Sequence, residues 1–272
     1  PLSLTAHAGV AIYPDDAANR ELLLQAADTA LDAARSAGDA YRLYDDTLRR
    51  AGESRAEIKS RLQTALDNND LMLYFQPQIN LRDNSLGGCE ALMRWNHATA
   101  GWISPEVFIP IAESSELIDA LTYWSVNVAL KEWFQHCRAC SETVPVSVNL
   151  SAKLLHSPEV VDLVERALNI WGAAPGSLVM EVTESAMMAD PKAALRTLSA
   201  LNERGVTISI DDFGTGYSSL AYLKQLPVGE LKIDRSFVQH MAEDAMDRRI
   251  VQSVIDLAHN LGLKVVAEGI ED

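Results

Sequence analysis

Short runs of strand-forming residues alternate with longer helical stretches over most of this 272-residue chain, from residue 70 onwards. Apolar residues recur at helical spacing in the longer stretches, which include 117–137, 158–171, 190–204 and 244–261. This alternation is typical of a parallel sheet whose strands are each followed by a helix, so the sequence predicts an α/β fold. The seven strand candidates are 71–81, 86–95, 144–150, 177–184, 206–212, 230–234 and 263–269.

The last six of these strands all end in polar or ionisable side chains after an apolar run. In a β/α barrel the carboxyl ends of the strands open onto one face, where catalytic groups lie. A single polar strand end is simply a place where the chain leaves the core, but six in succession indicate one acidic site. The side chains are Glu90, Asn149, Glu181 with Glu184, Asp211 with Asp212, Lys232 with Asp234, and Glu268.

Such a cluster of carboxylates favours bound cations, because neighbouring carboxylates repel one another and raise one another's pKa. Oxygen ligands with one amide, and no histidine or cysteine, suit Mg²⁺ or Mn²⁺ better than Zn²⁺. The adjacent pair Asp211 and Asp212 suits two metals about 3.5–4 Å apart that share one carboxylate. Two metals beside Lys232 predict hydrolysis of a phosphate ester, with the lysine holding or helping to deprotonate the water. A salt bridge from Lys232 to a neighbouring strand's carboxylate fits the pattern equally well.

The charge balance restricts the partners of the chain. A net charge of −15 argues against nonspecific binding to nucleic acid or to a membrane surface. No apolar run approaches the length of a membrane span. The three cysteines lack a disulfide-framework spacing, so we expect a cytoplasmic location. Anchoring of a parent protein through upstream segments stays open.

Six motifs in the second part of the chain resemble those of one family, the EAL domain of bacterial cyclic di-GMP phosphodiesterases. The segments FQPQINL (75–81), FIPIAESSELI (108–118) and LKQLP (223–227) fit the same pattern in order. The motifs are EALMRW (90–95), SVNLS (147–151), EVTES (181–185), DDFGTGYSSL (211–220), LKIDRSFV (231–238) and VVAEGIE (265–271).

The resemblance implies a TIM-like (β/α) barrel whose first strand runs antiparallel. It implies hydrolysis of one phosphodiester bond of cyclic di-GMP to linear 5′-pGpG, with two Mg²⁺ or Mn²⁺ ions as cofactors and Ca²⁺ as an inhibitor. It also implies a homodimer formed through the EAL domain.

Residue roles follow from the same resemblance. The first metal's ligands are Glu90, Asn149, Glu181 and Asp211, with Asp211 bridging to a second site completed by Asp212 and Glu268. Lys232 orients or activates the water, Arg94 lies on the phosphate side of the substrate, Gln76 lines the pocket, and Glu184 braces the DFGTGYSS loop. The residues alone favour a surface ion pair for Arg94 and a helix N-terminal acid for Glu184.

The domain organisation is also predicted. Residues 1–48 resemble the C-terminal third of a GGDEF (diguanylate cyclase) domain without its signature loop, so this part is not expected to make cyclic di-GMP. Residues 49–55 are expected to form a linker or helix, and 56–272 an EAL domain. The family pattern continues past residue 272 to a further helix and strand, so we expect a barrel truncated before its last strand. Strands 71–81 and 263–269 should then each have an unpaired edge.

Two other functions are compatible with these observations. One is a catalytically weak or inactive EAL domain that acts as a cyclic di-GMP sensor or a protein-interaction module. The other is an unrelated metal-dependent barrel hydrolase, which the order of the motifs disfavours. The intact acidic positions and Lys232 favour an active enzyme.

Overall fold

A computed structural model of the chain describes residues 6–68, 70–97, 101–137, 144–214 and 220–270. The chain divides into two compact units, Pro1–Ala65 and Leu66–Asp272.

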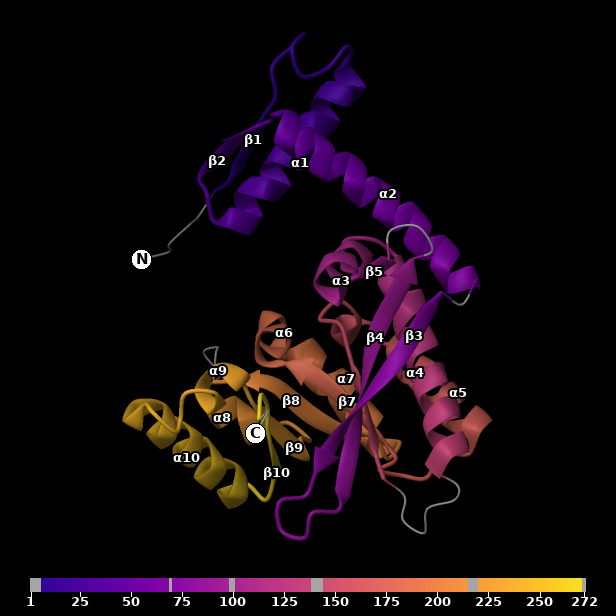
Figure 1. Ribbon diagram of the computed structural model, residues 1–272, viewed down its shortest axis with the longest axis vertical. Helices are drawn as coiled ribbons and strands as arrows, with labels where there is room; N and C mark the ends of the chain where they lie inside the picture. Colours follow the sequence, from indigo (N-terminus) through magenta and orange to yellow (C-terminus); the bar gives the residue numbers. More distant parts are fainter. Residues whose placement is uncertain (1–5, 69, 98–100, 138–143, 215–219, 271–272) are drawn as a thin grey trace. The chain divides into compact units, whose positions relative to one another are not determined.

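The first unit contains two short parallel strands and a helix (Figure 1). Strand β1 (Ala8–Val10) pairs with β2 (Tyr41–Leu43), and α1 (Arg20–Ala37) connects them. A Cβ atom on Gly9 would lie only 2.0 Å from the carbonyl oxygen of Ala27 in α1, so the absent side chain lets helix and strand approach closely. Each of the two strands has three residues, whereas α1 has 18.

Helix α2 (Asp46–Asn68) follows and contains residues 49–55, which were predicted as a linker or helix. The division between the two units falls inside this helix, after Ala65.

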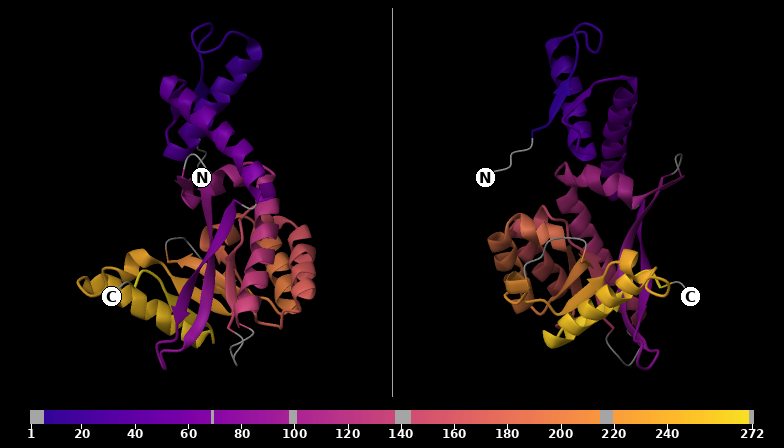
Figure 2. Two further views of the ribbon diagram at one scale, coloured as in Figure 1. Left: turned by 45° about the vertical axis from the view of Figure 1, so that its right-hand side comes forward. Right: turned by 90° about the vertical axis from the view of Figure 1, so that its left-hand side faces the viewer.

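The second unit is built on a sheet that curls into a half-barrel (Figures 1 and 2). Its strands follow the order β3-β4-β6-β7-β8-β9-β10, and β5 (Gly101–Ile103) pairs with β4 outside this path. β3 is antiparallel to β4, as the resemblance implies, whereas the pairs from β4–β6 to β9–β10 are parallel. All seven predicted strands are present: β3 (Leu71–Ile79), β4 (Leu86–His97), β6 (Val146–Asn149), β7 (Leu178–Thr183), β8 (Thr207–Phe213), β9 (Glu230–Ile233) and β10 (Lys264–Ala267).

The four helices predicted between these strands are also present, with ends within one residue of the prediction. The shorter elements of this unit were not predicted: β5, α3 (Pro105–Glu113), η1 (Leu154–His156), α6 (Glu184–Ala189), α8 (Leu220–Leu223) and α9 (Arg235–Val238). The helices and the one 3-10 turn of this unit are α3, α4 (Leu117–Cys137), η1 (Leu154–His156), α5 (Glu159–Trp171), α6 (Glu184–Ala189), α7 (Pro191–Glu203), α8 (Leu220–Leu223), α9 (Arg235–Val238) and α10 (Ala245–Asn260).

Alternation of side chains divides each strand between two faces of the sheet. In β7, Leu178, Met180 and Val182 join the hydrophobic core that the surrounding helices help to form. The residues between them, including Glu181, point to the opposite face, which lines the inside of the half-barrel. The same alternation in the neighbouring strands places their polar residues on this inner face.

The sheet is open at its two ends. Among the described residues, β3 has only β4 as a sheet neighbour and β10 has only β9. Within the described part of the chain, each of these two strands therefore has one edge without a strand partner, as expected.

Candidate active site

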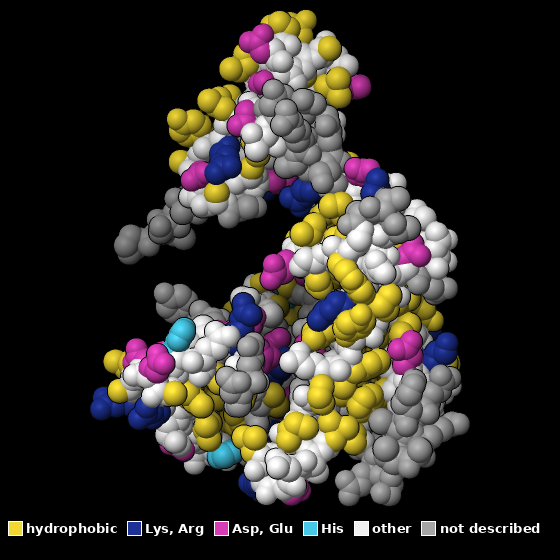
Figure 3. Space-filling model, viewed as in Figure 1, with side chains coloured by type: hydrophobic (Ala, Val, Ile, Leu, Met, Phe, Trp, Pro, Cys, Tyr) yellow, Lys and Arg dark blue, Asp and Glu magenta, His cyan; other side chains and the backbone are white. Residues whose placement is uncertain are grey.

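The inner face of the half-barrel brings together polar side chains from six strands, near the carboxyl ends of β6 to β10 and near the middle of β4. Strand register explains part of this: Asn149 lies opposite Glu181. The amide Nδ2 of Asn149 also donates a hydrogen bond of 3.0 Å to Glu90 Oε1. In the space-filling view, acidic side chains are visible inside a hollow of this face (Figure 3). The structure thus places in one site groups that lie far apart in the sequence.

Lys232 lies at the centre of this group. Its ammonium Nζ is within salt-bridge distance of four carboxylates, and its side chain is 2% exposed. The distances are 2.6 Å to Glu268, 2.8 Å to Glu181, 3.1 Å to Glu90 and 3.2 Å to Asp211. The salt-bridge interpretation of Lys232 is therefore confirmed, and its partners extend well beyond one neighbouring strand.

A local irregularity in β8 explains how two consecutive aspartates can serve one site. In a regular strand their side chains would point to opposite faces. Here the pairing with β9 shifts register between Ile210 and Phe213, and Asp212 has a positive φ of 53°. The backbone N–H of Asp212 donates to Asp211 Oδ1 at 3.0 Å. A bulge of this kind re-aims side chains, and it brings both carboxylates to the inner face.

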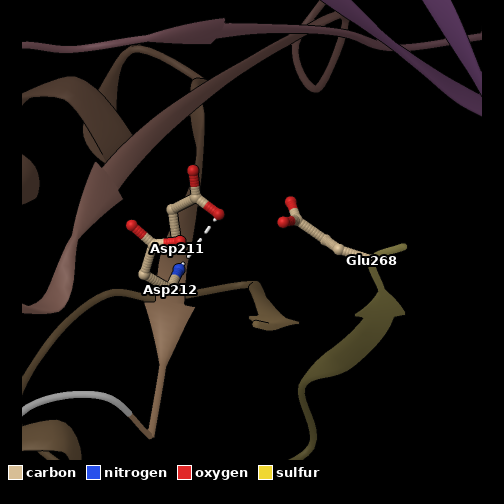
Figure 4. A group of neighbouring side chains, drawn as sticks. All are labelled: Asp211, Asp212 and Glu268. Atoms are coloured by element: carbon tan, nitrogen blue, oxygen red, sulfur yellow. Dashed lines mark hydrogen bonds between the residues drawn. The ribbon is translucent and has the colours of Figure 1, made fainter. Parts of the chain in front are cut away.

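Asp211, Asp212 and Glu268 form a compact oxygen cluster. One carboxylate oxygen from each lies within 4.8 Å of the other two. Figure 4 shows Glu268, which follows β10, directed across a gap toward Asp211 at the end of β8. This set matches the residues predicted for the second metal.

Burial and mutual repulsion make the site electrostatically unusual. Burial, only partly offset by Lys232, raises the pKa of Glu181 to about 8. Burial also raises the pKa of Glu268, and burial with the charges of Asp211 and Asp234 raises that of Asp212. For Lys232, burial alone would lower the pKa, but the surrounding carboxylates raise it well above its ordinary value. The lysine is thus a permanent cation among more acids than it can neutralise.

The donor set fits a hard divalent cation. Every predicted ligand offers a carboxylate or amide oxygen, the type that Mg²⁺ and Mn²⁺ prefer. Oxygen Oε1 of Glu181 is buried and has no hydrogen-bond partner within the described part of the chain, which is costly unless a further positive group reaches it.

Glu184 contacts Gly214, the residue that follows β8. It is 2% exposed, and its Oε2 accepts a hydrogen bond of 3.1 Å from the backbone N–H of Gly214. It is also the first residue of α6, where a negative charge is favourable. Both interpretations of Glu184 are therefore compatible with its position. Residues 215–219 of the DFGTGYSS loop lie outside the described residues.

Gln76 and Arg94 lie on the same face of the sheet as Glu90, but only Gln76 is next to it. Gln76 of β3 is directly opposite Glu90 of β4 and is exposed. Arg94 is four residues beyond Glu90, about 13 Å along the strand. Its guanidinium donates to the carbonyl of Met93 at 2.8 Å and lies 5.6 Å from the centre of the Tyr74 ring. Among the described residues, Glu90 pairs with Lys232 and not with Arg94.

The aromatic residues beside Arg94 were not predicted from the sequence. Tyr74 and Trp102 help to line a cavity of about 510 Å³ with Arg94. Tyr74 could have been found, because it is two residues before Gln76 and so shares its face of β3. Trp102 could not, because the three-residue strand β5 that carries it has no periodic pattern.

Fold and site together define an α/β half-barrel protein with an acidic site at the carboxyl ends of its strands. The chain belongs to the EAL domain family, whose model matches residues 59–272. None of its described helices is both long and apolar enough to cross a membrane.

Individual relatives agree with this assignment. The chain is 38% identical over 269 residues to the bifunctional diguanylate cyclase/cyclic di-GMP phosphodiesterase MucR of Pseudomonas aeruginosa, covering 98% of this chain and 39% of MucR. It is 39% identical over 271 residues to the cyclic di-GMP phosphodiesterase NbdA of the same organism, covering 99% of this chain and 35% of NbdA. A solved structure of the PaMucR phosphodiesterase in complex with c-di-GMP superposes with a TM-score of 0.75 at 41% identity, covering 79% of this chain and 87% of that one. The chain therefore spans less than half the length of these two curated relatives.

Proposed function

We propose that this chain hydrolyses cyclic di-GMP to linear 5′-pGpG with the help of two divalent cations, in bacterial second-messenger signalling. The observation that carries the proposal is the buried Lys232 ammonium within 3.2 Å of four carboxylates from separate parts of the sheet. Membership of the EAL family and the activities named for MucR and NbdA support the choice of substrate.

The chain offers two sets of ligands for Mg²⁺ or Mn²⁺. Glu90, Asn149, Glu181 and Asp211 would hold one cation, and Asp211, Asp212 and Glu268 would hold the other. When bound, the cations lower the pKa of a water and neutralise phosphoryl oxygens. In the reaction, water adds its oxygen to phosphorus, the bond from phosphorus to the 3′ oxygen breaks, and that oxygen takes up a proton.

Lys232 contributes charge rather than basicity. In the metal-free protein the surrounding carboxylates raise its pKa and keep a proton on the amine, so the ammonium donates hydrogen bonds. It orients that water and stabilises negative charge on the phosphoryl group. Arg94 holds the substrate's phosphate side, Gln76 lines the pocket, and Glu184 fixes the start of the loop after β8 through Gly214.

Several further properties belong to the same proposal. Residues 1–48 are the C-terminal remnant of a GGDEF domain, 49–55 connect it, and 56–272 form the EAL domain. The match to MucR, which is named as bifunctional, covers 98% of this chain and so includes most of that N-terminal part. We further propose homodimerisation through the EAL domain, inhibition by Ca²⁺ and a cytoplasmic location.

The test is turnover of cyclic di-GMP by the full chain with Mg²⁺ or Mn²⁺, followed by chromatographic separation of pGpG. We expect product with the wild-type chain and none with Asp211→Asn. The control variant Asp256→Asn, at an exposed position of α10, should retain activity. Binding of cyclic di-GMP without turnover in either metal would instead support a sensor.

A further inference from the structure

A row of three polar side chains crosses β7, β8 and β9, which are adjacent in the sheet (Figure 1). The strand register aligns Glu181 with Ser209, and Ser209 with Glu230. Residues in register share one face of a sheet, so all three side chains are on the inner face. Ser209 is two residues before Asp211, and Glu230 is two residues before Lys232. The row therefore extends from the carboxylate cluster to the layer directly below it.

This row is almost completely closed to solvent. The exposed fraction is 1% for Glu181, 0% for Ser209 and 7% for Glu230. Within the described part of the chain, five buried side-chain polar atoms have no hydrogen-bond partner, and three of them are Glu181 Oε1, Ser209 Oγ and Glu230 Oε1. A buried polar atom without a partner is costly, and native proteins satisfy nearly all such atoms. Three in consecutive places of one row indicate a bound group that serves them together.

The spacing of the strands suits a small bound group. Neighbouring strands are about 4.8 Å apart, so the backbones of Glu181 and Glu230 are separated by about 10 Å. The two long glutamate side chains can approach each other across the short Ser209, where one small group can contact all three. Lys264 of β10 is next in the row, but it is exposed and forms no ion pair with Glu230 among the described residues.

A water molecule matches the number and type of these partners. A water has two donors and two acceptor positions, and buried waters typically make about three hydrogen bonds to otherwise unsatisfied groups. Divalent cations such as Mg²⁺ and Ca²⁺ take six or more oxygen ligands, whereas the row supplies three. Oε2 of Glu181 already accepts from Lys232 at 2.8 Å. A carboxylate has about four lone-pair positions, so a water on Oε1 leaves room on Glu181 for the cation of the first metal site.

We propose that Glu181, Ser209 and Glu230 bind one buried water, through which Ser209 and Glu230 act as positioning residues for Glu181. The water links the Glu181 carboxylate to the layer below it and limits its orientations. The positioning role rests on the proposed function, in which Glu181 is a metal ligand. Groups that orient a metal ligand commonly change metal affinity by about 10- to 100-fold.

A crystal structure of the metal-free full chain, grown in rubidium chloride, identifies the bound group directly. We expect an electron-density peak within hydrogen-bond distance of all three oxygen atoms, without the anomalous signal of Rb⁺. An anomalous peak would show a cation in place of the water. A direct bond between Ser209 and Glu230, or an ion pair between Glu230 and Lys264, with no such peak would also overturn the proposal.

The stability of Ser209→Ala tests the same site in solution. Removing a hydroxyl that is bonded to a buried water should lower the melting temperature by about 2–4 °C. Removing a buried hydroxyl that has no partner should instead raise the melting temperature or leave it unchanged, and this result would contradict the water site. The control Ser125→Ala removes a buried hydroxyl of α4 that donates to the carbonyl of Thr122 at 3.0 Å. Its melting temperature should also fall.

The affinity for Mn²⁺, measured by calorimetry, tests the positioning role. Ser209→Ala and Glu230→Met should each weaken Mn²⁺ binding by about 10-fold, whereas Ser125→Ala should leave it unchanged. Glu230→Gln should retain most of the affinity, because its amide offers the water both a donor and an acceptor. Equal losses in Glu230→Gln and Glu230→Met would show that the charge of Glu230 is required, and would overturn positioning through a water.

Turnover of cyclic di-GMP by the wild-type chain in Mg²⁺ or Mn²⁺ separates this inference from the proposed function. Turnover without a water peak in the crystal refutes the water site and leaves hydrolysis standing. A water peak without turnover supports the water site and refutes hydrolysis. Absence of both refutes both.

Discussion

The ammonium of Lys232 donates a hydrogen bond of 2.8 Å to Oε2 of Glu181, and both side chains are almost completely buried. Removing one partner of such a pair leaves a buried charge without compensation. Lys232 also faces three further carboxylates. Lys232 is therefore the internal counter-ion that allows these acids to share one site.

Replacing Lys232 by methionine should destabilise the metal-free protein by about 3–5 kcal/mol, because the ionised carboxylates around it then lose their shared cation. Addition of Mg²⁺ or Mn²⁺ should raise the melting temperature more in this variant than in the wild type, since the metal replaces part of the lost charge. The control Lys264→Met, at an exposed lysine of the neighbouring strand β10, should change stability by less than about 0.5 kcal/mol. Equal stability of Lys232→Met and wild type would contradict a charge-compensating role.

Replacing Lys232 by alanine should lower kcat by about 100- to 1,000-fold while metal and cyclic di-GMP binding persist. The loss is expected because the lysine stabilises charge that develops during the reaction. Steady-state kinetics and a binding isotherm on the same preparation provide the measurement. An unchanged kcat would assign Lys232 to the structural ion pairs alone.

Metal binding should release a proton below pH 8. Glu181 has a pKa raised to about 8, so it is protonated at neutral pH in the metal-free protein and must ionise to become a ligand. Affinity for Mn²⁺ should therefore increase as the pH rises from 6 toward 8. Calorimetric titrations in two buffers with different ionisation enthalpies count the released protons.

The same shift affects the stability of the metal-free protein. The folded pKa of Glu181 lies above the ordinary value of 4.5, so the folded state holds more protons than the unfolded state between these limits. Stability should therefore fall as the pH rises from about 5 to about 8. In Glu181→Gln the proton release on metal binding and the fall in stability with rising pH should both be smaller, because the amide does not titrate. A stability that rose over this pH range would contradict the assignment.

Glu184→Ala should lower turnover although the residue is outside the carboxylate cluster. The variant removes the acceptor for the backbone N–H of Gly214 and so frees the start of the loop after Asp212. Glu184→Gln keeps an acceptor oxygen and should retain more activity than alanine. Equal loss in the two variants would show that the charge of Glu184, and not its hydrogen bond, is required.

The sequence was informative wherever a local pattern is repeated. Apolar runs followed by polar residues identified all seven strands of the half-barrel path, and helical periodicity located α4, α5, α7 and α10. Convergence of Glu181 and Glu268 could be predicted because parallel strands share one carboxyl edge, whereas Glu90 lies near the middle of β4. Elements of three residues such as β5 have no comparable signal.

Other features of the site depend on tertiary geometry that periodicity does not contain. The sequence places Asp211 and Asp212 next to each other, but regular alternation would have separated their side chains. Their side chains reach the same face of the sheet because of the bulge and the positive φ of Asp212. Likewise, Tyr74 and Trp102 meet through the pairing of two different strands with β4.

The backbone conformation of Asp212 permits a final prediction that separates strain from metal binding. A φ of 53° is unfavourable for residues with a Cβ but not for glycine. Asp212→Gly should therefore be more stable than Asp212→Ala by about 1 kcal/mol in the absence of metal, although both lack the carboxylate. Both should bind Mn²⁺ more weakly than the wild type.

The matched control is Asn84, which has a φ of 59° in the turn between β3 and β4. The variant Asn84→Gly should likewise be more stable than Asn84→Ala, and neither variant should change the affinity for Mn²⁺. Chemical denaturation and metal titration of the four variants measure both quantities, and equal stability of Asp212→Gly and Asp212→Ala would show that Asp212 is not strained.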